Sequence, residues 1–205
     1  MGIPREEVRL EGDAEQPRMI GSKTRRDYTR MMESFSRTRV RAIAQRDLSG
    51  YILKARSPSC GMERVKLHES SGLKGRTRGI FARRLLDHLP HLPIEEEGRL
   101  NDPVLRESFV ERVLCYRRWR DLLAGGLTRG RLVAFHAAHK AVLLAHSPAR
   151  TAELGRLVAS AKDFTQAALA EKYAALFFGT LSHRATRKRH ANVPEHKELA
   201  PRNPV

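Results

Sequence analysis

The sequence has few cysteines, few aromatic residues and no long apolar run. Its 205 residues include two cysteines, Cys60 and Cys115, and aromatic residues make up 6% of the chain. Two cysteines without an apolar leader segment do not build a disulfide framework, which favours a reducing compartment, the cytoplasm. No stretch approaches the roughly 18 apolar residues of a membrane span. The low aromatic content gives little support to a stacking surface for single-stranded nucleic acid.

Acidic residues are scarce relative to basic ones. Lysine and arginine number 39 against 23 aspartate and glutamate residues, for a formal net charge of +16. Such a charge favours polyanionic partners, nucleic acid among them. The alternative is a chain that uses arginine as a solvated cation on all its faces. A weak nucleic-acid surface would draw on six basic residues of the C-terminal half: Arg129, Arg131, Arg184, Arg187, Lys188 and Arg189.

The first hundred residues alternate strand-like and helical segments. Apolar residues at 8–10 and 18–21 predict a hairpin or a strand followed by a turn, and a helix is expected over 25–46 with Thr24 as its N-cap. The next segments are predicted as a strand at 51–55, an extended piece at 62–69, a Gly-rich basic loop at 70–79 and a helix at 80–89. The loop could in principle hold a phosphate, but it lacks a phosphate-binding fingerprint. This order of elements is typical of an α/β unit.

Everything beyond residue 102 has a helical pattern. Asp102 is a good N-cap with Pro103 at the first helical position. The predicted helices run from Pro103 to Gly125, over 129–145, from Ser147-Pro148 onward, and from Asp163 into the basic run 184–190. We therefore expect an α/β domain over 1–100 and an all-α domain over 101–205, with helix predominant overall.

The segment Ser57-Pro58-Ser59-Cys60-Gly61 is the main candidate site. Pro58 keeps Ser57 away from helical angles, and Gly61 permits an abrupt turn. Cys60 is therefore expected beyond the carboxyl end of a strand, at the rim where open α/β sheets bind ligands. A thiol there suits a metal ligand or a nucleophile, whereas most lone cysteines are small hydrophobes.

Three histidines lie on one face of the helix predicted from residue 129. His136, His139 and His146 fall within a quarter turn of one another, a pattern that suggests a metal site. Three ligands spread along one helix cannot close on one ion without a ligand from elsewhere. Polar packing between helices is therefore the simpler interpretation.

Several strings of the sequence resemble a known family. The strings "GIPREEVRL", "IGSKTRRDYT", "GYILKARSPSCGMERVK" and "RGIFARRLLDHLPHLPIEEEGRLNDP" are similar to the later part of the TudS-type thiouracil desulfidase family. The string "LVAFHAAHKAVLLAHSPARTAELGRLVA" and the residues up to "TRKRHANV" resemble the YbgA-type helical domain often fused behind it. The resemblance covers nearly the whole chain and implies a partial Rossmann-like sheet for the first domain.

The resemblance implies a cofactor and a substrate. Members of the family bind a four-iron four-sulfur cluster through three cysteines, and the open fourth iron takes the sulfur of a thiolated uracil, which water replaces with oxygen. Cys60 matches the last of the three cluster cysteines. Ser57 matches a serine placed beside the thiolated pyrimidine. No membrane partner is implied.

The chain departs from the family pattern in its cysteines, and this departure determines which function we expect. The family's other two cluster cysteines precede the "GIPRE" region, with which this chain begins, and Cys115 stands mid-helix in "ERVLCYRRW". One thiolate does not hold a cubane cluster. We therefore expect an incomplete desulfidase-family chain that is inactive by itself, which leaves its status as an enzyme open. A gene fragment, a mis-called start or a frameshift would explain why both ends depart from the family pattern. The alternative is a non-enzymatic helical module that binds nucleic acid or a protein partner.

Overall fold

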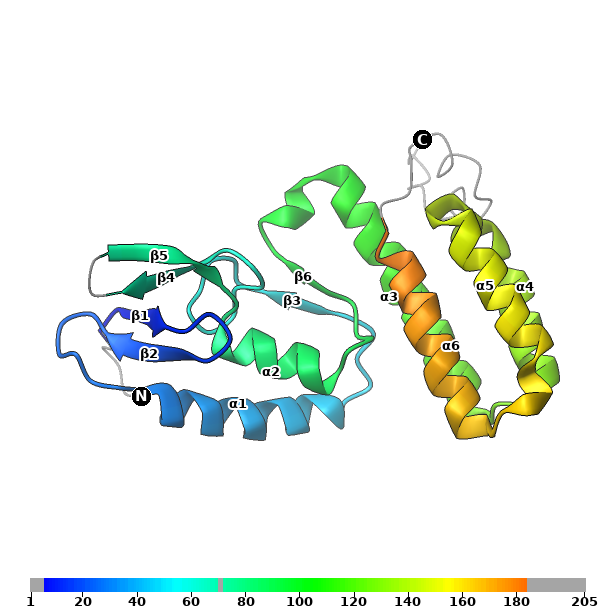
Figure 1. Ribbon diagram of the computed structural model, residues 1–205, viewed down its shortest axis with the longest axis horizontal. Helices are drawn as coiled ribbons and strands as arrows, with labels where there is room; N and C mark the ends of the chain where they lie inside the picture. The colour runs from blue at the N-terminus through cyan, green and yellow to red at the C-terminus, as the bar shows by residue number, and fades with distance from the viewer. Residues whose placement is uncertain (1–5, 70–71, 184–205) are drawn as a thin grey trace, which may run out of the picture. The chain divides into compact units, whose positions relative to one another are not determined.

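The computed structural model describes residues 6–69 and 72–183 (Figure 1). It confirms the predicted fold class, an α/β part followed by an all-α part with helix predominant overall. The chain forms two compact units, residues 1–116 and 117–205. Unit 1 contains β1 (Val8–Gly12), β2 (Pro17–Gly21), α1 (Thr29–Ala44), β3 (Tyr51–Leu53), β4 (Val65–Glu69), β5 (Gly72–Thr77), α2 (Ile80–His88), β6 (Ile94–Glu96), a 3₁₀ turn (Arg99–Asn101) and the first part of α3 (Pro103–Ala124).

A four-stranded mixed sheet forms one side of unit 1. The predicted hairpin is confirmed, because β1 and β2 pair antiparallel with Leu10 opposite Met19. β1 also pairs parallel with β4, and β4 pairs antiparallel with β5, so the strand order is β2-β1-β4-β5. The loop predicted over 70–79 is wrong for residues 72–77, which form β5. Pairing with β4 outweighs the weak strand propensity of the glycines in this segment.

A second sheet contains only β3 and β6, and it is parallel. Tyr51 lies opposite Ile94, and Leu53 lies opposite Glu96. The carboxyl ends of the two strands therefore lie at the same edge of this sheet. The chain that leaves β3 begins beside the residue that follows β6, since the Glu97 N–H donates to the Leu53 carbonyl at 3.0 Å.

Helices α1 and α2 lie side by side in unit 1 (Figure 1). The predicted N-cap of the first helix, Thr24, is wrong, because the helix begins at Thr29 after Tyr28. The Thr24 hydroxyl instead donates to the carboxylate of Glu6, and the Thr29 N–H donates to Asp27 Oδ1 at 2.9 Å. A contact with a residue far back in the sequence thus decides where this helix starts.

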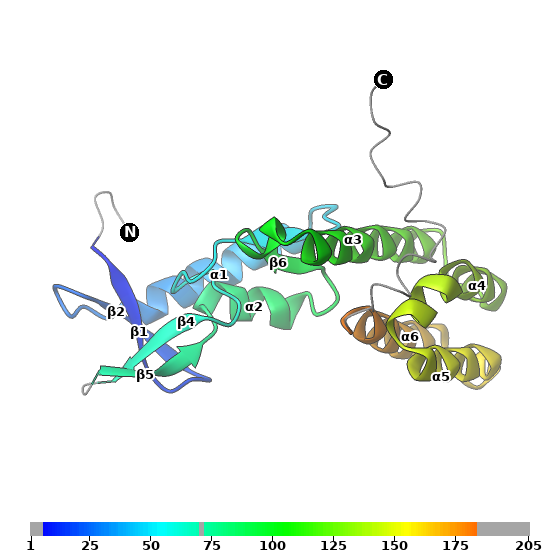
Figure 2. The same ribbon diagram turned by 90° about the horizontal axis from the view of Figure 1, so that it is seen from above.

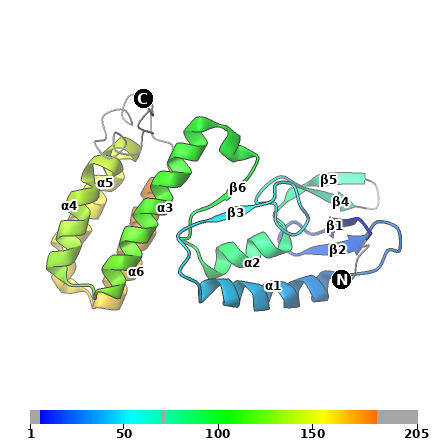
Figure 3. The same cartoon turned by 180° about the vertical axis from the view of Figure 1, so that it is seen from behind.

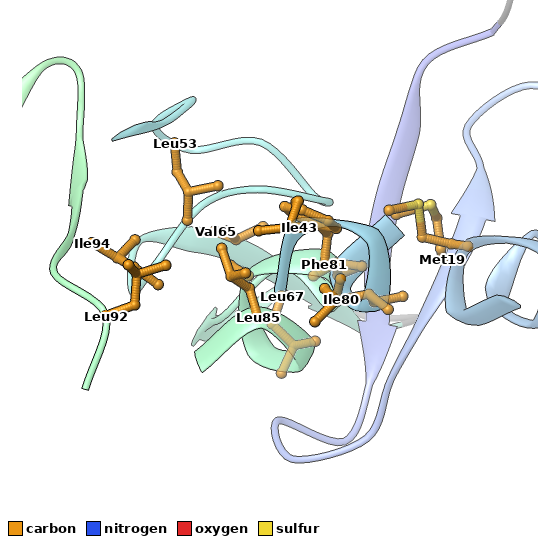
Figure 4. Packing of buried hydrophobic residues seen from close by; sticks show 14 residues of the cluster. Met19, Ile43, Leu53, Val65, Leu67, Ile80, Phe81, Leu85, Leu92 and Ile94 are labelled. Atoms are coloured by element: carbon orange, nitrogen blue, oxygen red, sulfur yellow. The ribbon is translucent and has the colours of Figure 1, made fainter. Parts of the chain in front are cut away.

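Side chains from both sheets and both helices form one core in unit 1. Figure 4 shows Val65 and Leu85 side by side within the cluster, with Leu53 and Ile94 extending it to the β3–β6 pair. Burying each such side chain fully contributes about 1.5–3 kcal/mol. The fully buried members of the core are Leu10, Met19, Val40, Val65, Leu67, Ala82 and Leu85.

Unit 2 is helical and has an aromatic core. Figures 2 and 3 show its helices α4, α5 and α6 packed together. Trp119 stacks on Tyr173 with ring centroids 5.4 Å apart, and Tyr173 stacks on Phe177 at 5.7 Å. Its elements are the end of α3, α4 (Arg129–His146), α5 (Pro148–Ala159), a 3₁₀ turn (Ala161–Asp163) and α6 (Gln166–Leu181).

Capping residues set most of the helix starts beyond residue 100. Asp102 accepts a hydrogen bond from the first turn of α3, and Ser147 caps α5, so both predicted starts are confirmed. The start predicted at Asp163 is wrong, because Asp163 ends a 3₁₀ turn and Thr165 caps α6 with its hydroxyl. The basic run 184–190 lies outside the described residues. In the described parts of the chain, no helix is long and apolar enough to cross a bilayer.

Candidate functional site

Cys60 lies in the turn between β3 and β4, which we call the cysteine turn (residues 55–62). The thiol and both serines of the turn are half-buried. Ser57 Oγ lies 3.0 Å from Ser59 Oγ, and Ser59 Oγ lies 3.5 Å from Cys60 Sγ. The Gly61 N–H donates to the Ser57 carbonyl at 2.8 Å and closes the turn. The structure therefore brings Ser57 and Cys60 together through Ser59.

The cysteine turn packs against the N-terminus of α2. The Ser59 carbonyl accepts from the N–H groups of Phe81 and Ala82 at 2.9 and 3.1 Å, and the Pro58 carbonyl accepts from Ile80 at 3.2 Å. The first N–H groups of a helix have no partner within the helix. Here the turn supplies the acceptors, so the two segments stabilise each other.

Gly79, the residue before α2, has no room for a side chain. A Cβ atom built there would overlap the Ser59 carbonyl and would lie 2.8 Å from the Cys60 nitrogen. The atoms in the way belong to the backbone, so no side-chain rotation can relieve the overlap. Gly79 also donates its N–H to the Gly61 carbonyl at 2.8 Å. This glycine therefore allows α2 to approach the cysteine turn closely.

Two consecutive carboxylates at the end of β6 hold the two flanks of the cysteine turn. Glu96, which is 4% exposed, accepts from the Met62 N–H at 2.7 Å. Glu97 accepts from the Ala55 N–H at 2.7 Å, and Lys54 Nζ lies 3.3 Å from its carboxylate. The Ala55 N–H, with help from Lys54, lowers the pKa of Glu97 below its ordinary value. Sequence reasoning missed both residues, because a run of three glutamates is typical of a solvated surface.

The neighbouring Glu95 carboxylate serves a different part of unit 1. It is 5% exposed, and it lies 2.7 Å from Arg99 Nε and 3.5 Å from a terminal nitrogen of Arg112. Burial lowers the pKa of Arg112, and the Glu95 charge opposes that effect. Glu95 thus links β6 to α3. The cysteine turn has a further contact from Arg78, whose Nε donates to the Met62 carbonyl at 3.0 Å.

The donor set at the cysteine turn does not by itself fit an iron–sulfur cluster. Cys60 is the one thiol there, and Cys115 is 2% exposed within α3. Within residues 6–69 and 72–183, no three His, Cys, Asp or Glu side chains form a group that could hold a metal ion. A cluster held through three cysteines needs two more thiolates than the turn provides.

The three histidines of α4 use their Nδ1 atoms in hydrogen bonds within unit 2. Burial, with smaller effects from Lys140 and His139, lowers the pKa of His136. The metal-site interpretation of these histidines stays a prediction. The bonds join His136 to the Tyr173 hydroxyl at 3.2 Å, His139 to the Phe135 carbonyl at 2.8 Å, and His146 to the His183 carbonyl.

Two of the six basic residues suggested for nucleic acid lie in the described part of unit 2. Arg129 donates to the Lys162 carbonyl at 3.3 Å, and Arg131 donates to the carbonyls of Gly125 and Gly126. Both guanidinium groups therefore bind backbone oxygens of their own unit. The other four basic residues lie outside the described residues, and the nucleic-acid surface stays a prediction.

Comparison with known families bears out the resemblance found in the sequence. Residues 1–97 match the family model described as 2-thiouracil desulfurase, and residues 140–197 match the model described as a protein of unknown function, DUF1722. The chain thus joins a region that matches the 2-thiouracil desulfurase model to a region that matches the DUF1722 model, which is the YbgA-like part. No curated protein and no solved structure matches the chain.

Proposed function

We propose that the cysteine turn forms part of a site at which a thiolated pyrimidine loses its sulfur. Overall, the thiocarbonyl sulfur is exchanged for the oxygen of water, and the sulfur leaves as hydrogen sulfide. The observation that carries this proposal is the placement of one thiol and two hydroxyls in a single braced turn. That turn follows the carboxyl end of the parallel β3–β6 pair, within the region that matches the desulfurase family.

Ser57 and Cys60 have distinct roles in this proposal. A hydroxyl donates one hydrogen bond and accepts others, so Ser57 suits the mixed ring N–H and carbonyl edge of a pyrimidine. Ser59 binds Ser57 Oγ and approaches Cys60 Sγ, which links the substrate-facing hydroxyl to the thiol. Cys60 would supply one thiolate ligand of the four-iron four-sulfur cluster, as the family resemblance implies.

The chain by itself is proposed to be inactive. It has two cysteines, and Cys115 is buried in α3 rather than in the cysteine turn. A desulfidase of this kind therefore requires further thiolates from another polypeptide segment. The active form would combine residues 1–100, proposed as the desulfidase domain, with a segment that carries two further cluster cysteines.

Anaerobic reconstitution with iron and sulfide tests this proposal. The chain alone should retain no stoichiometric cluster. The chain mixed with or fused to a family segment bearing two cysteines should acquire cluster absorption and remove sulfur from thiouracil. Cys60→Ser should abolish both properties in the combined protein, whereas Cys115→Ala should retain them. A cluster and desulfidation that survive Cys60→Ser would refute the assignment of the site.

A further inference from the structure

We infer that Glu96 and Glu97 are positioning residues that fix Cys60 in place from both flanks of the cysteine turn. Each carboxylate accepts a hydrogen bond from one backbone N–H. Glu97 accepts from Ala55, which precedes the serines, and Glu96 accepts from Met62, which follows the thiol. The eight residues from Ala55 to Met62 thus have both ends tied to the last residue of β6 and the residue that follows it.

The parallel pairing of β3 and β6 makes this arrangement possible. Leu53 lies opposite Glu96, so the chain leaves β3 beside the end of β6. Glu96 is the last residue of β6 and Glu97 is the first residue of the turn that follows it, and the two adjacent carboxylates reach different parts of the cysteine turn. A lone glutamate at this edge could hold only one flank.

Glu96 contributes more to the positioning than Glu97 does. The backbone of Met62 is held on both sides, since its N–H donates to Glu96 and its carbonyl accepts from Arg78. Glu96 is almost fully buried, whereas Glu97 is half-buried and shares its charge with Lys54. A hydrogen bond to a carboxylate is stronger away from water, and an N–H that loses its buried partner costs more.

The inference rests on the proposed function only for what Cys60 would bind. The positioning is a property of this chain without iron, and it can be measured on the thiol itself. A thiol whose turn is held rigidly reacts slowly with a bulky reagent, because Sγ stays half-buried. Freeing one flank of the turn should therefore speed the reaction of Cys60 and leave Cys115 unaffected.

The test measures disulfide-reagent labelling of the full chain from pH 6 to 9, with Cys60 and Cys115 resolved by peptide mass spectrometry. Glu96→Ala should raise the Cys60 rate about tenfold, because it removes a charge-assisted hydrogen bond. Glu96→Gln keeps an acceptor oxygen and should stay within about twofold of the wild-type rate. Glu97→Ala should give a smaller rise than Glu96→Ala. The matched control is Glu69→Ala, which removes an exposed ion pair with Lys74 in the β4–β5 hairpin and should change neither rate.

Three results would overturn the inference. One is an unchanged Cys60 rate in Glu96→Ala. Another is an equal rise for Cys60 and Cys115, which would show general unfolding. The third is fast exchange of the Met62 amide with deuterium in the wild-type chain, where the hydrogen bond to Glu96 should make this exchange slow. This measurement replaces the labelling test if Glu96→Ala does not fold. None of these measurements uses iron, so failure of cluster reconstitution alone would refute the proposed function and leave the positioning intact.

Discussion

Replacing Gly79 with alanine is the most direct test of the contact between α2 and the cysteine turn. Gly79 has φ −64° and ψ 149°, angles that alanine adopts without strain. The substitution therefore tests space rather than backbone conformation. The added methyl would meet the Ser59 carbonyl and the Cys60 nitrogen, both of which belong to the turn.

Two effects of opposite sign set the expected change in unfolding free energy. Alanine reduces the conformational freedom of the unfolded chain, which stabilises a protein by about 0.4–1 kcal/mol where its side chain fits. Overpacking against atoms that cannot rotate away destabilises by about 1–3 kcal/mol. Displacing α2 would also weaken its hydrogen bonds to the turn, each worth about 1 kcal/mol. The overlap should prevail, with a net loss of about 2 kcal/mol from the stability of unit 1.

Urea unfolding followed by two signals separates the units. Far-UV circular dichroism reports both of them, whereas the fluorescence of Trp119, the single tryptophan, reports unit 2. Gly79→Ala should shift the circular dichroism transition of unit 1, leave the Trp119 transition in place and speed the labelling of Cys60. The matched control is Gly98→Ala, because Gly98 has helical angles and nothing lies within 4 Å of a Cβ built there. It should be neutral or slightly stabilising.

A Gly79→Ala variant as stable as the wild type, with an unchanged Cys60 labelling rate, would contradict the expected overlap between α2 and the cysteine turn. That outcome would mean that α2 and the turn can move apart without loss, so that the hydrogen bonds between them add little. A shift of equal size in Gly98→Ala would show that glycine removal in itself, rather than the overlap, is responsible.

Three further outcomes are expected. Ser147→Ala should lower the stability of unit 2 by about 1 kcal/mol, seen in Trp119 fluorescence, because it removes the side-chain cap of α5. Hydrogen bonds from the Thr24 hydroxyl and its neighbours lower the pKa of Glu6 from 4.5 to about 2. The stability that this carboxylate contributes above pH 4.5 should therefore be lost as the pH falls toward 2. Glu6→Gln should flatten this part of the plot of unfolding free energy against pH. If the positive charge binds nucleic acid, the logarithm of the affinity for labelled RNA should fall linearly with the logarithm of the salt concentration. Absence of binding at about 50 mM salt would exclude nucleic-acid binding.

Local chemistry predicted the parts of the fold that depend on local contacts. The hairpin, the helix starts at Asp102 and Ser147, and the placement of Cys60 after a strand follow from turn and cap residues close in sequence. The start predicted at Asp163 was a local error, because Thr165 caps α6, whereas two other errors arose where distant residues decide. The Thr24 hydroxyl binds Glu6 instead of capping α1, and the Gly-rich segment 72–77 becomes a strand because β4 pairs with it.

The supports of the cysteine turn were missed for the same reason. A sequence of three glutamates indicates a solvated surface, since carboxylates are seldom buried without partners. Here the partners are the N–H groups of Ala55 and Met62, more than thirty residues earlier in the chain. Local reasoning identified the turn by its serines, proline and cysteine, but only the pairing of β3 with β6 shows what holds it.

The residues that hold the cysteine turn also indicate where a domain that contains the turn can end. The contacts of the turn described above come from residues up to Glu97, which is also where the match to the desulfurase family ends. Compact unit 1 nevertheless continues to residue 116, within α3. Glu95 explains the difference, because this buried carboxylate pairs with Arg112 in the first part of α3. A chain cut after residue 100 would remove Arg112 from Glu95, which would keep its contacts with Arg99 and with the Glu96 N–H beside the two glutamates that hold the turn. The candidate site residues thus lie within residues 1–100, while the strand that holds them contacts a helix that lies beyond.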